Sequence, residues 1–146
     1  LNVDILGMKG KSRVITVPAD IQKLWNDVRV ILRNPVIARY ELKEDIQLGK
    51  KAGITALCEY SLLSDNEYPT YAITKKEITE SGIRKMKQVH SGEEIGCVVL
   101  ELGYFIDFKN KKLEDPLSVT LSLTESEKQD ERIGISIKRM LEEYVW

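Results

Sequence analysis

The stretch EIGCVVLELGYFIDF, residues 94–108, is nearly continuous in apolar residues from Ile95 to Phe108 and is broken at Gly103. A short apolar run of this kind is typical of a strand that is buried on both faces. We expect one long bent strand or two short strands here, at the centre of a sheet and of the hydrophobic core.

Two stretches before it predict further strands. VIARYEL, residues 36–42, alternates between apolar and polar side chains as a half-buried strand does, and TYAIT, residues 70–74, predicts a short strand. On the first of these strands, the side chains expected to share one face are Val36, Ala38, Tyr40 and Leu42.

Helices are predicted where apolar residues recur every three or four positions. One is expected between Asp20 and a stop at Asn34 and Pro35, and a second of about three turns within residues 49–63. The second should place Ile54, Leu57, Cys58 and Leu62 on one face, and a last helix should carry Ile133, Ile137, Met140, Leu141 and Tyr144 on its inner face.

Local signals mark the ends of two shorter helices. Thr74 and Glu77 form a T-x-x-E capping pattern, and Gly82 lies near the expected end of that helix. In DPLSVTLSL, residues 115–123, Asp115 is an N-cap and the following proline suits the first helical position. Its leucines and valine cover most of the helix circumference, so this helix should be enclosed on most sides as an internal packing element.

These elements predict a single α/β or α+β domain over residues 19–146, with a mixed central sheet of about four to five strands flanked by about four to five helices. Residues 1–18 should form a basic hairpin that precedes it. The chain has 146 residues, of which 42% are hydrophobic and 31% charged, and no apolar run approaches the roughly 18 residues of a membrane span. We therefore expect a globular protein without a membrane partner.

Charge and cysteine content exclude several classes of function. Lys and Arg number 22 against 23 Asp and Glu, so no overall positive field favours nucleic acid, and any DNA contact must come from a local patch. Cys58 and Cys97 have no CxxC partner and share the chain with one histidine, His90, so we expect no metal site and no cofactor. Without a signal-peptide pattern, two reduced thiols predict a cytoplasmic protein.

Six stretches carry a family resemblance: KGKSRVITVP (9–18), KLWNDVRVILRNPV (23–36), GITALCEYSLL (53–63), PTYAITKKE (69–77), DPLSVTLSL (115–123) and DERIGISIKRMLEEYVW (130–146). In order and spacing they resemble the C-terminal region of bacterial winged-helix regulators of the MarR-like type. More faintly, they resemble abortive-infection antitoxins that join a winged helix to an α/β domain. The resemblance covers nearly the whole chain, and its motifs are packing patterns rather than catalytic signatures.

The resemblance implies an N-terminal winged helix that binds DNA, followed by a domain that senses an effector, forms a homodimer or holds a partner such as a toxin. The chain starts at Leu1 without a methionine, which suggests that the winged helix lies upstream. Within the chain, Lys9, Lys11 and Arg13, which we call the basic turn, correspond to the wing. The basic turn either contacts DNA phosphates or is a solvated turn.

Two other groups of residues are candidate sites. Asp65, Glu67, Tyr68 and Tyr71 lie in or beside the loop SDNEYPTY, residues 64–71, which suits either a protein contact or an ordinary turn. The triplets ELK, residues 41–43, and DFK, residues 107–109, match the acid-x-Lys pattern of metal-dependent nucleases, with Glu93, Glu94 and Glu101 as candidate second acids.

From these observations we predict a non-catalytic regulatory domain of a DNA-binding transcriptional regulator, located in the cytoplasm. An antitoxin-like autorepressor module is the first alternative, and the nuclease is the second. No catalytic residue is expected under the main prediction, since the chain lacks a G-x-S-x-G elbow and a G-x-G-x-x-G phosphate loop.

Overall fold

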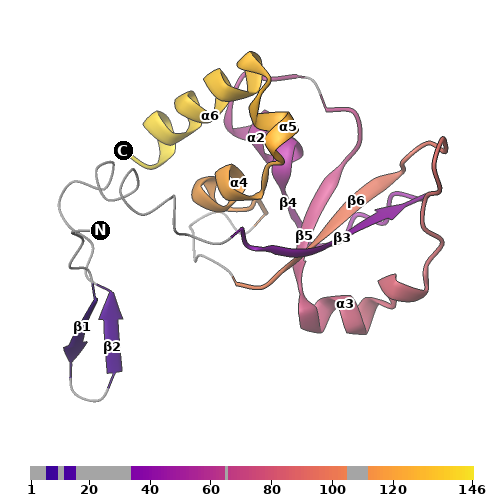
Figure 1. Ribbon diagram of the computed structural model, residues 1–146, viewed down its shortest axis with the longest axis horizontal. Helices are drawn as coiled ribbons and strands as arrows, with labels where there is room; N and C mark the ends of the chain where they lie inside the picture. Colours follow the sequence, from indigo (N-terminus) through magenta and orange to yellow (C-terminus); the bar gives the residue numbers. More distant parts are fainter. Residues whose placement is uncertain (1–5, 10–11, 16–33, 65, 105–111) are drawn as a thin grey trace.

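The central apolar stretch forms β6 (Cys97–Leu102), and all six of its residues are buried. This computed structural model describes residues 6–9, 12–15, 34–64, 66–104 and 112–146. β6 pairs antiparallel with β3 (Val36–Leu42) and parallel with β5 (Thr70–Thr74), and β4 (Lys50–Lys51) adds to the far edge of β5. The sheet order is β3-β6-β5-β4, which confirms a mixed sheet with the predicted strand at its centre (Figure 1).

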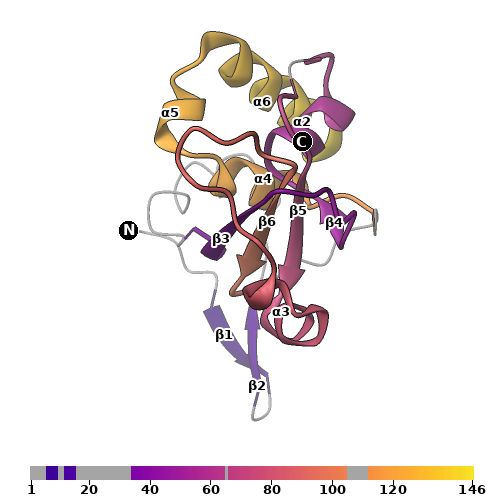
Figure 2. The ribbon, with the colours of Figure 1, turned by 90° about the vertical axis from the view of Figure 1, so that its right-hand side faces the viewer.

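Helices lie on both sides of this sheet. The described part of the chain holds α2 (Gly53–Tyr60), α3 (Lys75–Ser81), the 3₁₀-helix η1 (Ile83–Lys85), α4 (Pro116–Ser122), α5 (Glu125–Lys128) and α6 (Glu131–Tyr144). In both views the four-stranded sheet lies between α3 and the helices α2 and α6 (Figures 1 and 2). The predicted mixed α/β class is confirmed.

The two faces of the sheet carry different apolar clusters. On one face, residues from β3, β5 and β6 pack against α3 and η1, and the members are Leu42, Tyr71, Ile73, Ile78, Ile83, Cys97 and Val99. The opposite face carries Ala52, Ala72, Val98, Leu100 and Leu102. The alternation along β5 and β6 assigns neighbouring residues to opposite clusters, as the pleat of a strand requires.

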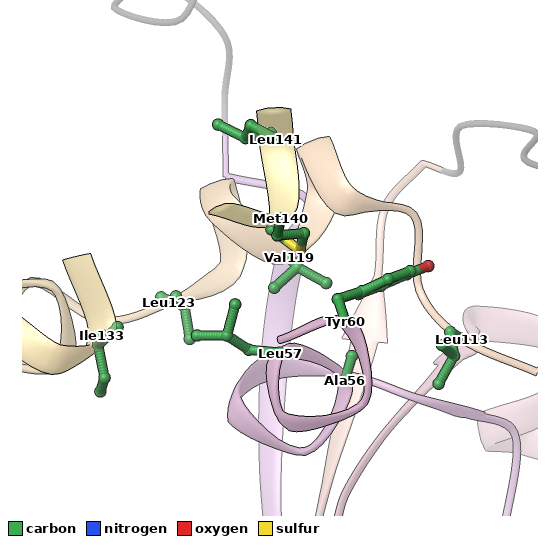
Figure 3. Packing of buried hydrophobic residues seen from close by; sticks show 9 residues of the cluster. All are labelled: Ala56, Leu57, Tyr60, Leu113, Val119, Leu123, Ile133, Met140 and Leu141. Atoms are coloured by element: carbon green, nitrogen blue, oxygen red, sulfur yellow. The ribbon is translucent and has the colours of Figure 1, made fainter. Parts of the chain in front are cut away.

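A third cluster lies among the helices. It brings together Ala56, Leu57, Tyr60, Leu113, Val119, Leu123, Ile133, Met140 and Leu141, which come mainly from α2, α4 and α6 (Figure 3). Trp146 packs against its edge, and the rings of Tyr60 and Tyr144 meet edge to face with centroids 5.0 Å apart.

The local signals for α4 and α3 are confirmed. The side chain of Asp115 accepts a hydrogen bond from the Ser118 N–H at 2.9 Å, and Pro116 occupies the start of α4. Val119 in this helix is fully buried, as expected for an enclosed element. At the start of α3, Thr74 and Glu77 form a reciprocal capping box, and Gly82 ends the helix with a left-handed φ of 71°.

The prediction that Val36 shares a face with Ala38, Tyr40 and Leu42 is wrong. The register of β3 against β6 shifts between Val36 and Ala38, and this bulge adds a residue to the strand. Val36 consequently packs with the cluster of Leu100 and Leu102, whereas Tyr40 and Leu42 pack on the α3 side.

One helix prediction also needs correction. The helix expected to run about three turns within 49–63 ends at Tyr60 as α2, so Leu62 lies beyond it and is 87% exposed rather than buried. The polar stretch before α6 is helical in part, because Thr124 and Glu127 form a second capping box that starts α5.

The predicted hairpin is present as β1 (Leu6–Lys9) and β2 (Ser12–Ile15), which pair antiparallel with Lys9 opposite Ser12. The helix predicted after Asp20 lies outside the described residues. Within the described ranges, every helix is too short or too polar to cross a lipid bilayer.

Candidate functional site

The domain has a groove with a volume of about 750 Å³. We call it the α2–α6 groove, because the start of α2 and the start of α6 both line it. β3, β6, the α2–β5 connection and α5 complete its walls. The lining includes Gly53, Ile54, Leu63, Leu100 and Ile133 as apolar residues and Arg39, Glu67, Tyr68, Glu127, Asp130 and Arg132 as polar ones. Its size and mixed lining are those of small-molecule sites.

The wall at α2 is held by one threonine. Thr55 Oγ1 accepts the Thr70 N–H at 2.9 Å and donates to Asn66 Oδ1 at 3.1 Å, so it ties the α2–β5 connection to the sheet. Gly53 has a φ of 53°, and a β-carbon there would lie 3.5 Å from Thr70 Cγ2. The N-cap Ala52 supplies no side-chain hydrogen bond to the first N–H groups of α2, which lie beside the groove.

The wall at α5 and α6 is held by two helix caps. Glu127 Oε1 accepts the Thr124 N–H at 2.9 Å within the second capping box. Asp130 caps α6 by accepting the Arg132 N–H at 2.9 Å, and its other oxygen lies 3.3 Å from the Arg132 guanidinium. These contacts hold the pKa of Asp130 below its usual value.

Arg39 crosses the sheet side of the groove. Its Nη2 donates to the Tyr68 hydroxyl at 3.0 Å, and its Nε lies 3.3 Å from Glu41 Oε1. Partial burial of the Arg39 guanidinium lowers its pKa. The contacts with Tyr68 and Glu41 together raise the pKa by more than burial lowers it, so the pKa of Arg39 is raised. The guanidinium is therefore a fixed, charged part of this wall.

A buried carboxyl group lies behind the groove. Glu114 is 3% exposed, and burial, helped by the charge of Asp115, raises its pKa to about 8 despite the opposing effects of the Ser122 hydrogen bond and the charge of Lys50. Its Oε1 lies 3.0 Å from the hydroxyl of Ser122, a groove residue, and its Oε2 has no hydrogen-bond partner within the described residues. The Ser122 hydroxyl is the donor in this contact, and it also lies within donating distance of the Ser118 carbonyl oxygen, at 2.6 Å.

The structure separates the four candidate residues of the SDNEYPTY loop. Glu67 and Tyr68 line the groove, whereas Tyr71 is 8% exposed on the opposite face of the sheet, where its hydroxyl donates to Asp45 at 2.8 Å. Tyr71 therefore cannot belong to a surface shared with Glu67 and Tyr68. Asp65 lies outside the described residues.

The described residues of the nuclease alternative do not converge. Glu41 lies on the groove face of β3, whereas Glu101 lies on the α3 face, where it accepts from Tyr40 at 3.2 Å and pairs with Arg84 at 3.4 Å. Lys43 pairs with Glu93 instead, at 2.6 Å, and Glu94 is exposed. Residues 107–109 lie outside the described chain, so the DFK triplet stays a prediction.

For the basic turn, the structure gives the backbone of two members: Lys9 ends β1 and Arg13 lies in β2, while Lys11 falls outside the described residues. A wing-like hairpin is consistent with this pairing, and the DNA contact stays a prediction.

A second concave surface lies between the ends of α2 and α6. It encloses about 620 Å³ and is lined by Glu59, Tyr60, Ser61, Leu62, Arg139, Glu142, Glu143 and Tyr144. Leu62 and Tyr144 expose 87% and 43% of their surface there. Large exposed apolar side chains beside acidic ones are typical of protein contacts.

Several groove residues were missed from the sequence. Glu127 was recoverable, because Thr124 and Glu127 repeat the T-x-x-E pattern of Thr74 and Glu77. Arg39 carried no such signal, since its partner Tyr68 is 29 positions away.

Comparisons of the chain with family models, with curated proteins and with solved structures found no match. The resemblance to winged-helix regulators therefore stays a prediction.

Proposed function

We propose that this chain is the non-catalytic regulatory domain of a DNA-binding transcriptional regulator, and that the α2–α6 groove is its effector site. The groove itself carries the proposal, because it combines an apolar lining with polar groups on a rigid frame. The frame is rigid since each wall is tied by hydrogen bonds, at Thr55 on one side and at the caps of α5 and α6 on the other.

Binding rather than catalysis is favoured by the roles of the charged groups. Asp130 and Glu127 cap helices, and Arg39 is bonded to Tyr68 and Glu41. A group committed to a structural bond is poorly placed to exchange protons with a substrate. Both cysteines are reduced thiols, which supports the proposed cytoplasmic location.

A fragment screen observed by methyl NMR tests the effector site. We expect small apolar ligands with one polar group to shift the methyl signals of Ile54, Leu63 and Ile133, which line the groove. The methyls of Ile73 and Ile78, buried on the other face of the sheet, serve as the internal control. A screen in which no ligand shifts the groove methyls, or in which all residues shift together, contradicts the proposal.

A partner-binding role of the antitoxin type is the second candidate, and the exposed Leu62 and Tyr144 favour it. The acidic Glu142 and Glu143 beside them suit a partner with basic side chains. The test is co-purification with the product of an adjacent gene, using Leu62→Asp and, as a control elsewhere on the surface, Met86→Asp. Equal retention by the wild type and the Leu62→Asp variant removes this surface from consideration.

A further inference from the structure

The charges that line the α2–α6 groove are not balanced. The two arginines are already neutralised, since Arg39 lies 3.3 Å from Glu41 and Arg132 lies 3.3 Å from Asp130. Glu67 has no hydrogen bond or ion pair to any described residue, and Glu127 uses one oxygen for the Thr124 N–H. The groove is therefore left with two carboxylates that have no cationic partner in the described chain.

These two carboxylates come from different walls. Glu67 belongs to the α2–β5 connection and Glu127 to α5, and both line the same cavity. A positive group placed in the groove would be attracted by both, whereas an anion would be repelled by them and would find each guanidinium already paired. The charges of the groove therefore favour a cationic ligand over an anionic one.

The other lining residues indicate which kind of uncharged body the ligand should have. Ile54, Leu63 and Leu100 offer an apolar surface, and the N–H groups at the start of α2 offer donors to a neutral acceptor atom. A volume of about 750 Å³ accommodates a ligand of one or two rings with a short chain.

We propose that the α2–α6 groove binds a small organic cation with an apolar body, such as an aromatic or aliphatic amine. This inference rests on the proposed function of the groove as an effector site and names the chemical class of that effector. Glu67 and Glu127 select the positive group, and the apolar lining holds the body.

Three indole probes of nearly equal shape test the proposal: tryptamine is a cation at neutral pH, tryptophol is neutral and indole-3-acetate is an anion. Affinities are measured by titration calorimetry at low salt, and the site is identified by the methyl signals of Ile54 and Leu63. We expect tryptamine to bind about tenfold more tightly than tryptophol, because the two carboxylates attract its ammonium group, and indole-3-acetate to bind most weakly.

The double variant Glu67→Gln/Glu127→Gln should abolish the preference for tryptamine while leaving tryptophol binding unchanged. Glutamine at position 127 can still accept the Thr124 N–H, so α5 keeps its cap. The matched control is Glu80→Gln, an exposed acid of α3, which should keep the preference.

The outcomes separate the two proposals. If tryptophol or indole-3-acetate binds the groove as tightly as tryptamine, the effector site stands and the cation proposal is overturned. The cation proposal is equally overturned if the double variant keeps the preference for tryptamine. If none of the three probes shifts the groove methyls, the cation proposal falls, and a fragment screen without groove hits then removes the effector site as well.

Discussion

Replacing Glu114 with glutamine is expected to remove most of a pH-dependent loss of stability in this protein. The carboxyl group is 3% exposed, and burial raises its pKa from 4.5 to about 8. Glutamine has the shape of the protonated acid and does not titrate. Its amide oxygen can accept the hydrogen bond that Ser122 Oγ donates to Glu114 Oε1 at 3.0 Å.

The direction follows from proton binding in the two states. The folded protein keeps the Glu114 proton up to about pH 8, whereas the unfolded chain releases it near pH 4.5. Stability from this group is therefore complete below pH 4.5 and is lost as the pH rises through 8. A difference of about 3.5 between the two pKa values corresponds to roughly 5 kcal/mol in total, of which about 3 kcal/mol falls between pH 6 and pH 9.

Urea denaturation at pH 6 and pH 9 measures this effect. The free energy of unfolding of the wild type should fall by about 3 kcal/mol more than that of Glu114→Gln over this range. The control is Glu125→Gln, because that side chain is 89% exposed, and it should behave as the wild type does. For each protein, the change in the free energy of unfolding between pH 6 and pH 9 is compared. Any effect of the amide that is equal at both pH values cancels in this change. An identical pH dependence in the wild type and Glu114→Gln would refute the argument that burial keeps this acid neutral.

Three further predictions follow from the packing, the caps and the hairpin. Met140 is fully buried in the helical cluster, so Met140→Ala should lower the free energy of unfolding by about 3 kcal/mol in urea denaturation, whereas Ile135→Ala, half exposed on the same helix, should change it by less than about 1 kcal/mol. Thr74→Ala removes the α3 capping box and should cost about 1 kcal/mol, measured in the same way, and Thr74→Ser should restore it. Alanine at all three positions of the basic turn should weaken binding to random duplex DNA and reduce the salt dependence of that binding, measured by fluorescence anisotropy. If the wild type shows no salt-dependent binding, the basic turn is a solvated turn without a role in DNA binding.

The sequence predicted those elements whose signals are local. β6 was recognisable because six consecutive buried residues leave an apolar run, and the start of α3 because Thr74 and Glu77 are three positions apart. The N-cap Asp115 and the adjacent proline gave the start of α4 in the same way. Such signals depend on hydrogen bonds within one helical turn, so tertiary structure does not change them.

The errors arose where the backbone departs from a regular repeat. The bulge after Val36 changes the face of that side chain, yet the sequence VIARYEL continues to alternate across it. Leu62 has the spacing of a buried helical residue, but the helix ends two positions earlier, at Tyr60. Periodicity assumes that an element is regular and continuous, and neither assumption held here.

The α2–α6 groove was the hardest feature to predict because several of its charged residues have local structural roles that explain their presence. Glu127 and Asp130 occur where helix caps are needed, and Arg39 occupies the polar side of an alternating strand. Nothing in those roles indicates a common cavity. These residues become neighbours because α4 packs on α2. The chain then returns through α5 and α6, and the starts of these two helices lie at the edge of the sheet. A site assembled in this way has no sequence motif, and its chemistry follows from the charges that the local roles leave without partners.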